Sequence, residues 1–373
     1  MTPRFTMDGS PALEAQLAAT CKTVLAGVRS LVPTAQLDGI ALGGGYGRGE
    51  GGVLKTPGGD QPYNDLEYFI FIRGNAILAE RKFRHQLHEL GERLSPDAEL
   101  EVEFKVLTLA KLRSSAPNMF YYDLLAGHRW IQGDDSLFAG CEHHRDAAKI
   151  PLYEATRLLF NRCSGLLYSL ERLRRNDFGT AEADFVGRNL AKAQLAFGDA
   201  LLAAHGKYHW SCRERHARLA KFDFKNELAW AAHLIKHHAT GVEFKLHPQR
   251  STETHDELAK RHAELSELGK QLWLWLESKR PGISFNTPHE YAMSRVDKCP
   301  ETSALRNRLV NFRVSGAKGL TCSRYPRERL FHALVLLLWS QNDHERIRSE
   351  LRTEEMDFTE LVANYAQLWG QFN

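Results

Sequence analysis

Long hydrophobic runs are missing from this sequence of 373 residues. The longest apolar run, residues 333–339, is far shorter than the about 18 residues that a transmembrane helix needs. No apolar stretch follows the first basic residue, so the sequence does not predict a signal peptide. The six cysteines are scattered without a Cys-x-x-Cys pair, which argues against a disulfide framework or a zinc site and predicts buried free thiols. We therefore expect a cytoplasmic protein that does not bind membranes.

A strong charge of one sign is also lacking. Lysine and arginine number 49 and aspartate and glutamate number 46, so the formal net charge is +3. This near balance gives no general argument for binding nucleic acid or a membrane surface. Hydrophobic residues make up 43% and charged residues 25%, which is typical of a globular protein and excludes a disordered or fibrous chain. The length favours two domains.

Glycine becomes sparse near residue 150, and long helical patterns dominate beyond that point. The segment 279–299 carries two prolines and few periodic apolar residues, so it predicts a loop. We expect residues 151–373 to form a helical bundle that binds a substrate or a partner. The helical patterns predict its helices over residues 152–173, 181–205, 225–240, 252–278 and 327–340.

Residues 1–150 mix helical and strand patterns, so the fold class is α+β. Apolar residues at helical spacing predict helices over 12–31 and 76–94. The stretch 43–52 is mostly glycine, and we expect neither a helix nor a strand there because glycine loses too much backbone freedom. Apolar runs and alternation predict strands over 37–42, 66–72 and 99–109.

Two carboxylates lie at the start of the second predicted strand. Asp65 and Glu67 are two residues apart, so their side chains point the same way on a strand. Adjacent carboxylates repel, and a hard cation such as Mg²⁺ is the simplest group that offsets the repulsion. The glycine-rich stretch before them offers unobstructed backbone amides that suit an anion such as phosphate. A metal site beside a phosphate cradle is the arrangement that phosphoryl transfer needs.

These segments, in this order, resemble the nucleotidyltransferase superfamily with the DNA polymerase β-like fold. The resemblance rests on Gly44-Gly45-Tyr46-Gly47-Arg48-Gly49-Glu50, on Asn64-Asp65-Leu66-Glu67 and on a third acid on a later strand, and it extends to about residue 140. Glu103 is preferred to Glu101 as the third acid, because residues 104–109 and 120–134 resemble the stretch that follows that acid in small nucleotidyltransferases.

The resemblance implies a nucleotidyltransferase fold over residues 1–150, with a mixed sheet flanked by helices. It implies transfer of a nucleoside monophosphate from a nucleoside triphosphate such as ATP to an acceptor hydroxyl, with two Mg²⁺ ions as cofactors. The metal-binding and catalytic residues would be Asp65, Glu67 and Glu103, of which Glu103 assists removal of the acceptor's proton. The nucleotide-binding residues would be Gly43, Gly44, Gly45, Tyr46, Gly47 and Arg48. The acceptor (a small molecule, a protein or an RNA) and the oligomeric state are left open.

Two departures from the family pattern keep other functions open. Gly45 stands where serine is usual, and Glu67 stands where aspartate is usual. One alternative is therefore a weakly active or inactive module that binds a nucleotide or a protein. Another is an antitoxin-like protein that acts on a protein or a tRNA.

Charged residues near this motif have plainer interpretations. Arg48 either contacts the triphosphate or forms a surface ion pair with Glu50, which would contribute little. Glu99, Glu101 and Glu103 also fit the solvated face of an edge strand, and we favour this interpretation for Glu99. Lys105 either neutralises the acids, contacts phosphate or is solvated, and we favour solvation.

Overall fold

The computed structural model describes residues 4–223 and 228–373, and the chain forms two compact units. Unit 1 comprises Met1–Glu154 and Leu202–Gln249, and unit 2 comprises Ala155–Leu201 and Arg250–Asn373. The predicted boundary near residue 150 coincides with the first passage between the units. The prediction of one domain over 151–373 was wrong, because residues 202–249 belong to unit 1. A helical period shows that a helix buries one face, but it does not show against which core.

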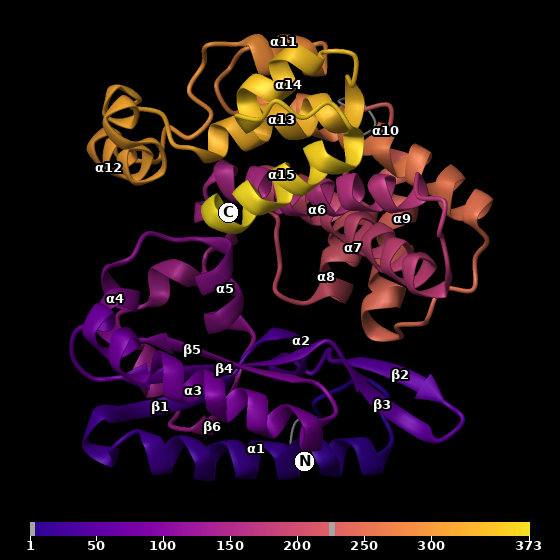
Figure 1. Ribbon diagram of the computed structural model, residues 1–373. Coiled ribbons are helices and arrows are strands. Elements are labelled where there is room, and N and C mark those ends of the chain that lie inside the picture. Colours follow the sequence, from indigo (N-terminus) through magenta and orange to yellow (C-terminus); the bar gives the residue numbers. More distant parts are fainter. Residues whose placement is uncertain (1–3, 224–227) are drawn as a thin grey trace. The chain divides into compact units, whose positions relative to one another are not determined.

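Unit 1 is built on a four-stranded mixed sheet with the order β5-β4-β1-β6 (Figure 1). Strand β1 is antiparallel to both of its neighbours, whereas β4 and β5 are parallel. The carboxyl end of β1 and the amino ends of β4 and β5 therefore lie at the same end of the sheet. The strands are β1 (Leu37–Leu42), β4 (Asp65–Ile72), β5 (Glu101–Leu107) and β6 (Arg129–Gln132).

Helices cover both faces of this sheet. Helices α1 (Pro11–Leu31) and α3 (Ala76–Ala98) form one core with side chains such as Ile70 of β4. The short helices α4 (Leu109–Ser114) and α5 (Met119–Ala126) form the other core with Phe69 and Phe71. The predicted helices over 12–31 and 76–94 and all three predicted strands are confirmed, as is the α+β class.

The glycine-rich stretch after β1 contains regular secondary structure. Gly44–Gly47 form a single helical turn, α2, and Gly52–Thr56 (β2) pairs with Gly59–Tyr63 (β3) in a hairpin. The expectation that this stretch holds no helix or strand was therefore wrong. Close packing explains why glycine occupies this helical turn: a Cβ on Gly47 would lie 2.2 Å from the carbonyl oxygen of Leu42. Only glycine lets the turn approach the strand so closely, which outweighs its low helix propensity of about 1 kcal/mol.

The rest of unit 1 includes helices α8 (Cys212–Lys221) and α9 (Ala231–Leu246). The predicted helix over 225–240 begins outside the described residues, and α9 extends further along the chain than predicted. Within unit 1, the Ser211 hydroxyl and the Cys212 amide both donate to the Glu50 carboxylate, so α8 is joined to the loop that follows α2. Short 3₁₀ helices are Thr34–Gln36, Asp135–Phe138, Glu142–Arg145 and Ala147–Lys149.

Unit 2 is helical. The predicted helices over 152–173, 181–205, 252–278 and 327–340 are confirmed, and α13 is buried along nearly its whole length, as its apolar sequence predicts. The predicted loop over 279–299 contains the short helix α11, which starts at Pro288, a position where proline is well tolerated. The helices lying wholly or largely in this unit are α6 (Leu152–Leu173), α7 (Thr180–Ala204), α10 (His255–Lys279), α11 (Pro288–Met293), α12 (Ala304–Ser315), α13 (Arg327–Trp339), α14 (His344–Leu351) and α15 (Phe358–Phe372), with a 3₁₀ helix over Gly316–Thr321.

All six cysteines are free thiols, five of them buried and Cys322 half-buried, which confirms the interpretation of their spacing. Among the described residues, no helix combines the length and the apolar character needed to cross a membrane.

Candidate functional site

Three carboxylates come together at the end of the sheet where β4 and β5 begin. Asp65 is the first residue of β4, and Glu67 pairs in register with Glu103 of the parallel strand β5. One oxygen from each side chain lies within 4.8 Å of the other two, and all three residues are half-buried. We call Asp65, Glu67 and Glu103 the acidic cluster. The structure thus brings together the three residues that the sequence predicted as metal ligands, whereas Glu101 is exposed.

The proximity of these carboxylates changes their acidity. Burial raises the pKa of Asp65, and the neighbouring Glu67 carboxylate raises it further. Burial also raises the pKa of Glu103, and Lys105 offsets only part of that increase. Both groups therefore hold their protons more tightly than isolated carboxyl groups, which is the expected result when acids share a confined site.

Lys105 supplies positive charge to the acidic cluster. Its Nζ contacts the Glu67 carboxylate and lies 3.7 Å from Oε2 of Glu103. Burial would lower the pKa of Lys105, but the attraction of Glu67, Glu103 and Asp65 together outweighs burial and the net change is an increase. The preference for a solvated Lys105 was wrong, and neutralisation of the acids is the alternative that the structure supports.

Turn α2 lies directly against Glu67. The Gly43 amide donates to the backbone carbonyl of Glu67 at 2.9 Å, and a Cβ on Gly44 would lie 2.9 Å from Oε2 of Glu67. Gly44 has a φ of +58°, which favours glycine. The first amides of a helix have no acceptor within that helix, and in α2 these are the amides of Gly44 and Gly45, next to Glu67.

The absence of serine at position 45 has a local cause. The Glu50 amide donates to the Gly45 carbonyl at 2.9 Å, which closes the loop over the turn. A Cβ on Gly45 would lie 3.0 Å from the Glu50 carbonyl oxygen, so a larger residue requires the loop to shift. Tyr46 does not replace a serine hydroxyl, because its own hydroxyl is buried, accepts from the Tyr63 amide at 2.7 Å and donates to the Gly52 carbonyl at 2.8 Å. Any phosphate contacts at this turn would therefore come from the backbone.

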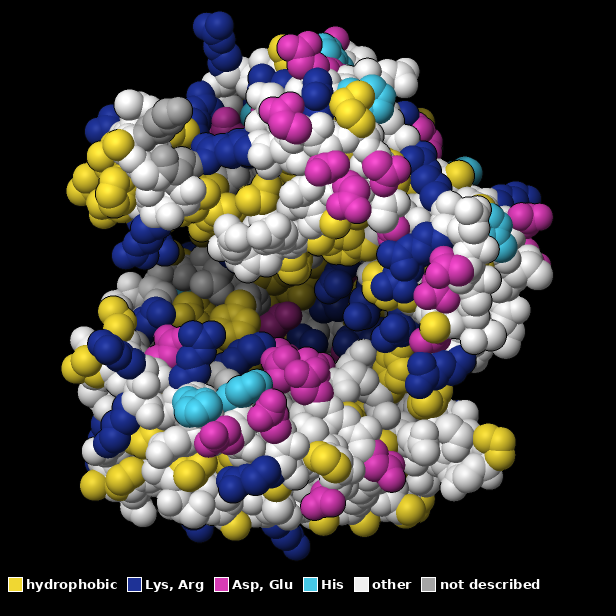
Figure 2. Space-filling view, in the orientation of Figure 1, with side chains coloured by type: hydrophobic (Ala, Val, Ile, Leu, Met, Phe, Trp, Pro, Cys, Tyr) yellow, Lys and Arg dark blue, Asp and Glu magenta, His cyan; other side chains and the backbone are white. Residues whose placement is uncertain are grey.

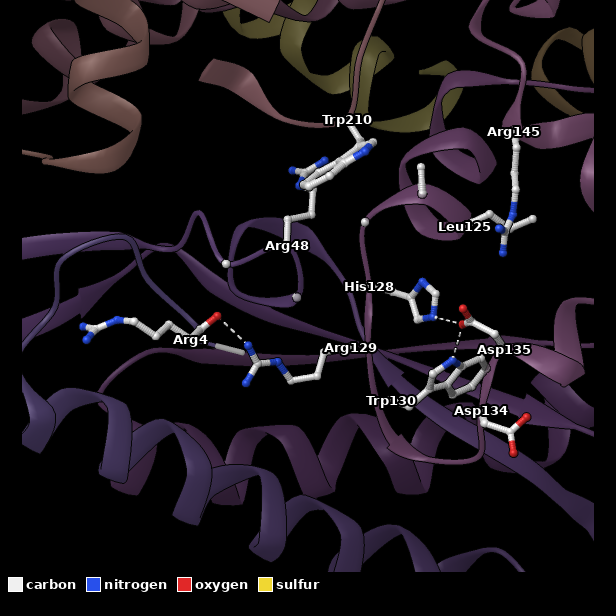
Figure 3. A pocket seen from close by; sticks show the side chains of 14 residues that line it. Arg4, Arg48, Leu125, His128, Arg129, Trp130, Asp134, Asp135, Arg145 and Trp210 are labelled. Carbon is white, nitrogen blue, oxygen red and sulfur yellow. Dashed lines mark hydrogen bonds and ion pairs between the residues drawn. The ribbon is translucent and has the colours of Figure 1, made fainter. Parts of the chain in front are cut away.

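Arg48 and Glu50 do not form the surface ion pair that was one of the sequence interpretations. Arg48 pairs with Asp123 of α5 at 3.1 Å, and its side chain is only 10% exposed. Burial lowers the pKa of Arg48, but Asp123, Tyr208 and Glu50 together outweigh burial and the net change is an increase. The guanidinium lies beside Trp210, in the wall of a hollow that contains no residue of the acidic cluster (Figure 3). Its predicted contact with a triphosphate stays a prediction.

Glu103 and Lys105 also line a groove of about 1260 Å³ between α3 and β5. Its walls carry both signs of charge, including Arg81 and Arg84 of α3, and Figure 2 shows acidic, basic and histidine side chains mixed on this face. The sequence analysis did not find this groove. A groove is formed by two elements far apart in the chain, and no local spacing signals it.

Sequence reasoning also missed Asp123, Arg129 and Trp210, which surround the guanidinium of Arg48 or the hollow beside it. They come from separate segments, and only the tertiary fold brings them together.

Comparisons with family models, curated proteins and solved structures found no match for this chain.

Proposed function

We propose that this chain is a Mg²⁺-dependent nucleotidyltransferase that transfers a nucleoside monophosphate from a nucleoside triphosphate to an acceptor hydroxyl. The observation that carries the proposal is the convergence of the acidic cluster, with one oxygen of each carboxylate within 4.8 Å of the other two. The placement of turn α2 after β1, the acid pair on β4 and the third acid on β5 supports the nucleotidyltransferase fold for unit 1.

The donor set of the acidic cluster fits Mg²⁺, which takes oxygen ligands and is commonly held by a few carboxylates together with substrate phosphates. When bound, two such ions neutralise charge on the phosphates and lower the pKa of the acceptor hydroxyl. Asp65, Glu67 and Glu103 would hold them.

The remaining steps belong to the chain itself. The amides of Gly44 and Gly45 would hold phosphate oxygens beside Glu67. The acceptor oxygen attacks the α-phosphorus, the new P–O bond forms as the bond to the leaving pyrophosphate breaks, and the acceptor's proton passes to Glu103.

The acceptor would bind in the groove between α3 and β5. Glu103 lines both this groove and the acidic cluster, so a hydroxyl carried into the groove would reach the proton acceptor. The mixed charges of the groove favour an acceptor that carries charged groups of its own.

A transfer assay with matched variants tests the proposal. Purified protein is incubated with labelled nucleoside triphosphates, MgCl₂ and cell extract, and the molecule that acquires label is identified. Asp65→Asn and Glu67→Gln should abolish transfer while circular dichroism stays unchanged. Glu89→Gln, an exposed acid on α3 that does not line the groove, should retain transfer. Unchanged transfer by both cluster variants would defeat the mechanism.

One observation favours a second candidate function. The ammonium of Lys105 contacts Glu67 and approaches Glu103, so the acidic cluster is partly neutralised by the chain itself. A partly neutralised acidic cluster would be sufficient for a protein that binds a nucleotide without transferring it. Calorimetry with ATP, with and without Mg²⁺, separates the two functions when it is run beside the transfer assay. Binding without label on any small molecule, protein or tRNA would favour the binding module.

A further inference from the structure

The hollow beside Arg48 has the features of a separate binding site. Its volume is about 1050 Å³, within the range of ligand pockets, and its lining comes from unit 1 (Figure 3). Four arginines and two tryptophans define it, and we call it the arginine pocket: Arg4, Arg48, Arg129, Arg145, Trp130 and Trp210.

Two arginines in the wall of the arginine pocket, Arg129 and Arg145, form no ion pair with a carboxylate that the structure describes, whereas Arg4 pairs with Glu14 at 3.8 Å and Arg48 with Asp123 at 3.1 Å. The carboxylates in the lining are Asp134 and Asp135. Asp135 already accepts from Trp130 Nε1 at 2.9 Å and contacts His128 at 3.1 Å, and Asp134 caps the 3₁₀ helix that follows it. Figure 3 shows the Asp135 contacts at one side of the pocket, away from Arg129 and Arg4.

Two of the arginines lack full partners. Arg129 packs its guanidinium on the Phe5 ring at 3.7 Å and donates to the Arg4 carbonyl, and it forms no ion pair with any carboxylate that the structure describes. Arg48 is nine-tenths buried, and within the described residues its Nε has no hydrogen-bond partner, as is also true of Nε of Arg129. Because Arg48 already pairs with Asp123, Arg129 is the one of these two guanidinium groups that an anion would partner.

The arginine pocket is distinct from the acidic cluster. Strand β6, which carries Arg129, is separated from β4 by β1, so the two sites are about 10 Å apart across the sheet. Turn α2 lies between them, with Gly44 against Glu67 and Arg48 in the pocket wall. No residue of the acidic cluster lines the pocket.

We infer that the arginine pocket binds a phosphate monoester that also contains a flat ring, such as a nucleoside monophosphate, without a metal ion. Guanidinium groups match phosphate oxygens with paired hydrogen bonds, and a dianion is the charge that several arginines accommodate. The indole of Trp210 is the ring in the lining on which a flat ligand can stack, because Trp130 packs against Phe71, Phe138 and His128. Binding here goes beyond the proposed nucleotide transfer and does not depend on it.

Calorimetric titration in the presence of EDTA tests this inference, with AMP as the complete probe and adenosine and inorganic phosphate as its two halves. AMP should bind saturably and at least about tenfold more tightly than either half. Arg129→Gln should weaken AMP binding by about tenfold or more. Because Arg129 also packs on Phe5, the exposed Arg145 provides a second variant that leaves the fold intact, and Arg145→Gln should weaken binding severalfold.

Two further variants serve as controls. Arg73→Gln, at the opposite end of the sheet and 64% exposed, should bind AMP like the wild type. Asp65→Asn should also leave AMP binding unchanged, which separates this site from the acidic cluster. The inference is overturned if AMP does not bind in EDTA, if it binds no better than inorganic phosphate, or if Arg129→Gln and Arg145→Gln both leave its affinity unaltered.

Discussion

Replacement of Lys105 by methionine removes the ammonium that neutralises the acidic cluster and keeps a side chain of similar length. Nζ of Lys105 contacts Glu67 and lies 3.7 Å from Glu103. Three carboxylates would then repel one another without a counter-ion. We expect Lys105→Met to make the metal-free protein less stable and, at the same time, to make it bind Mg²⁺ more tightly.

The sizes of both effects follow from charge and distance. A pair of unit charges 4 Å apart attracts by about 4 kcal/mol near a protein surface, but exposed pairs contribute only about 0.2–1 kcal/mol. The Lys105 side chain is 38% exposed, so its loss should cost the metal-free protein about 1–2 kcal/mol. A unit charge about 4 Å from a divalent ion is repelled by about 2 kcal/mol even in bulk water, so its removal should strengthen Mg²⁺ binding by about tenfold or more.

Urea unfolding gives the stability of the metal-free protein, and calorimetry gives the Mg²⁺ affinity. Lys105→Arg should resemble the wild type in both measurements. Lys55→Met, which removes the exposed ion pair with Asp60, should not change Mg²⁺ binding. The reasoning is refuted if Lys105→Met weakens Mg²⁺ binding, because Lys105 would then support the metal site instead of competing with the metal.

Three more predictions concern unit 1, with one control variant in unit 2. Gly44→Ala should lower the free energy of unfolding by about 1–2 kcal/mol, because Gly44 has a positive φ, and it should also reduce Mg²⁺ binding. Gly282→Ala, at a φ of +70° with open space around it, should lower stability alone. Urea unfolding measures the stability and calorimetry the Mg²⁺ binding. Glu50→Gln should destabilise the protein by about 1.5–3 kcal/mol in urea unfolding, since a buried carboxylate loses its two charged hydrogen bonds to α8. Because the pKa values of Asp65 and Glu103 are raised, protons displace Mg²⁺ from them at a higher pH than from ordinary carboxylates. The increase in melting temperature that Mg²⁺ gives at pH 7 should therefore shrink as the pH falls toward 5. An increase in melting temperature that stays constant over this interval would contradict those pKa directions.

The acidic cluster could be predicted from the sequence because strand periodicity is simple. Residues two apart share a face, which places Asp65 beside Glu67 and Glu103 beside Lys105. The register that sets Glu67 opposite Glu103 depends on how α3 returns the chain to the sheet, and periodicity does not contain it. The resemblance to a known family supplied only the choice of Glu103 as the third acid, and the structure brings Glu103 close to Asp65 and Glu67.

The packing of residues 202–249 on unit 1 could not be predicted. The carboxylate of Glu50 meets Ser211 across more than 150 residues of intervening chain, and no local pattern marks such a pair. A signal for α8 itself was present, because Ser211 and Glu214 have the spacing of a helix N-terminus and the Ser211 side chain accepts from the Glu214 amide. Close approach at Gly47 likewise depends on the strand beneath it, which explains why composition alone misjudged α2.

The position of the label in a nucleoside triphosphate tests the central claim most directly. Wild-type protein is given the nucleotide labelled at the α-phosphate or at the γ-phosphate, with MgCl₂ and extract. The proposed reaction predicts that α-label appears on the acceptor, that γ-label appears in pyrophosphate, and that Asp65→Asn yields neither product. Transfer of the γ-label to an acceptor, or equal transfer by wild type and Asp65→Asn, would contradict it.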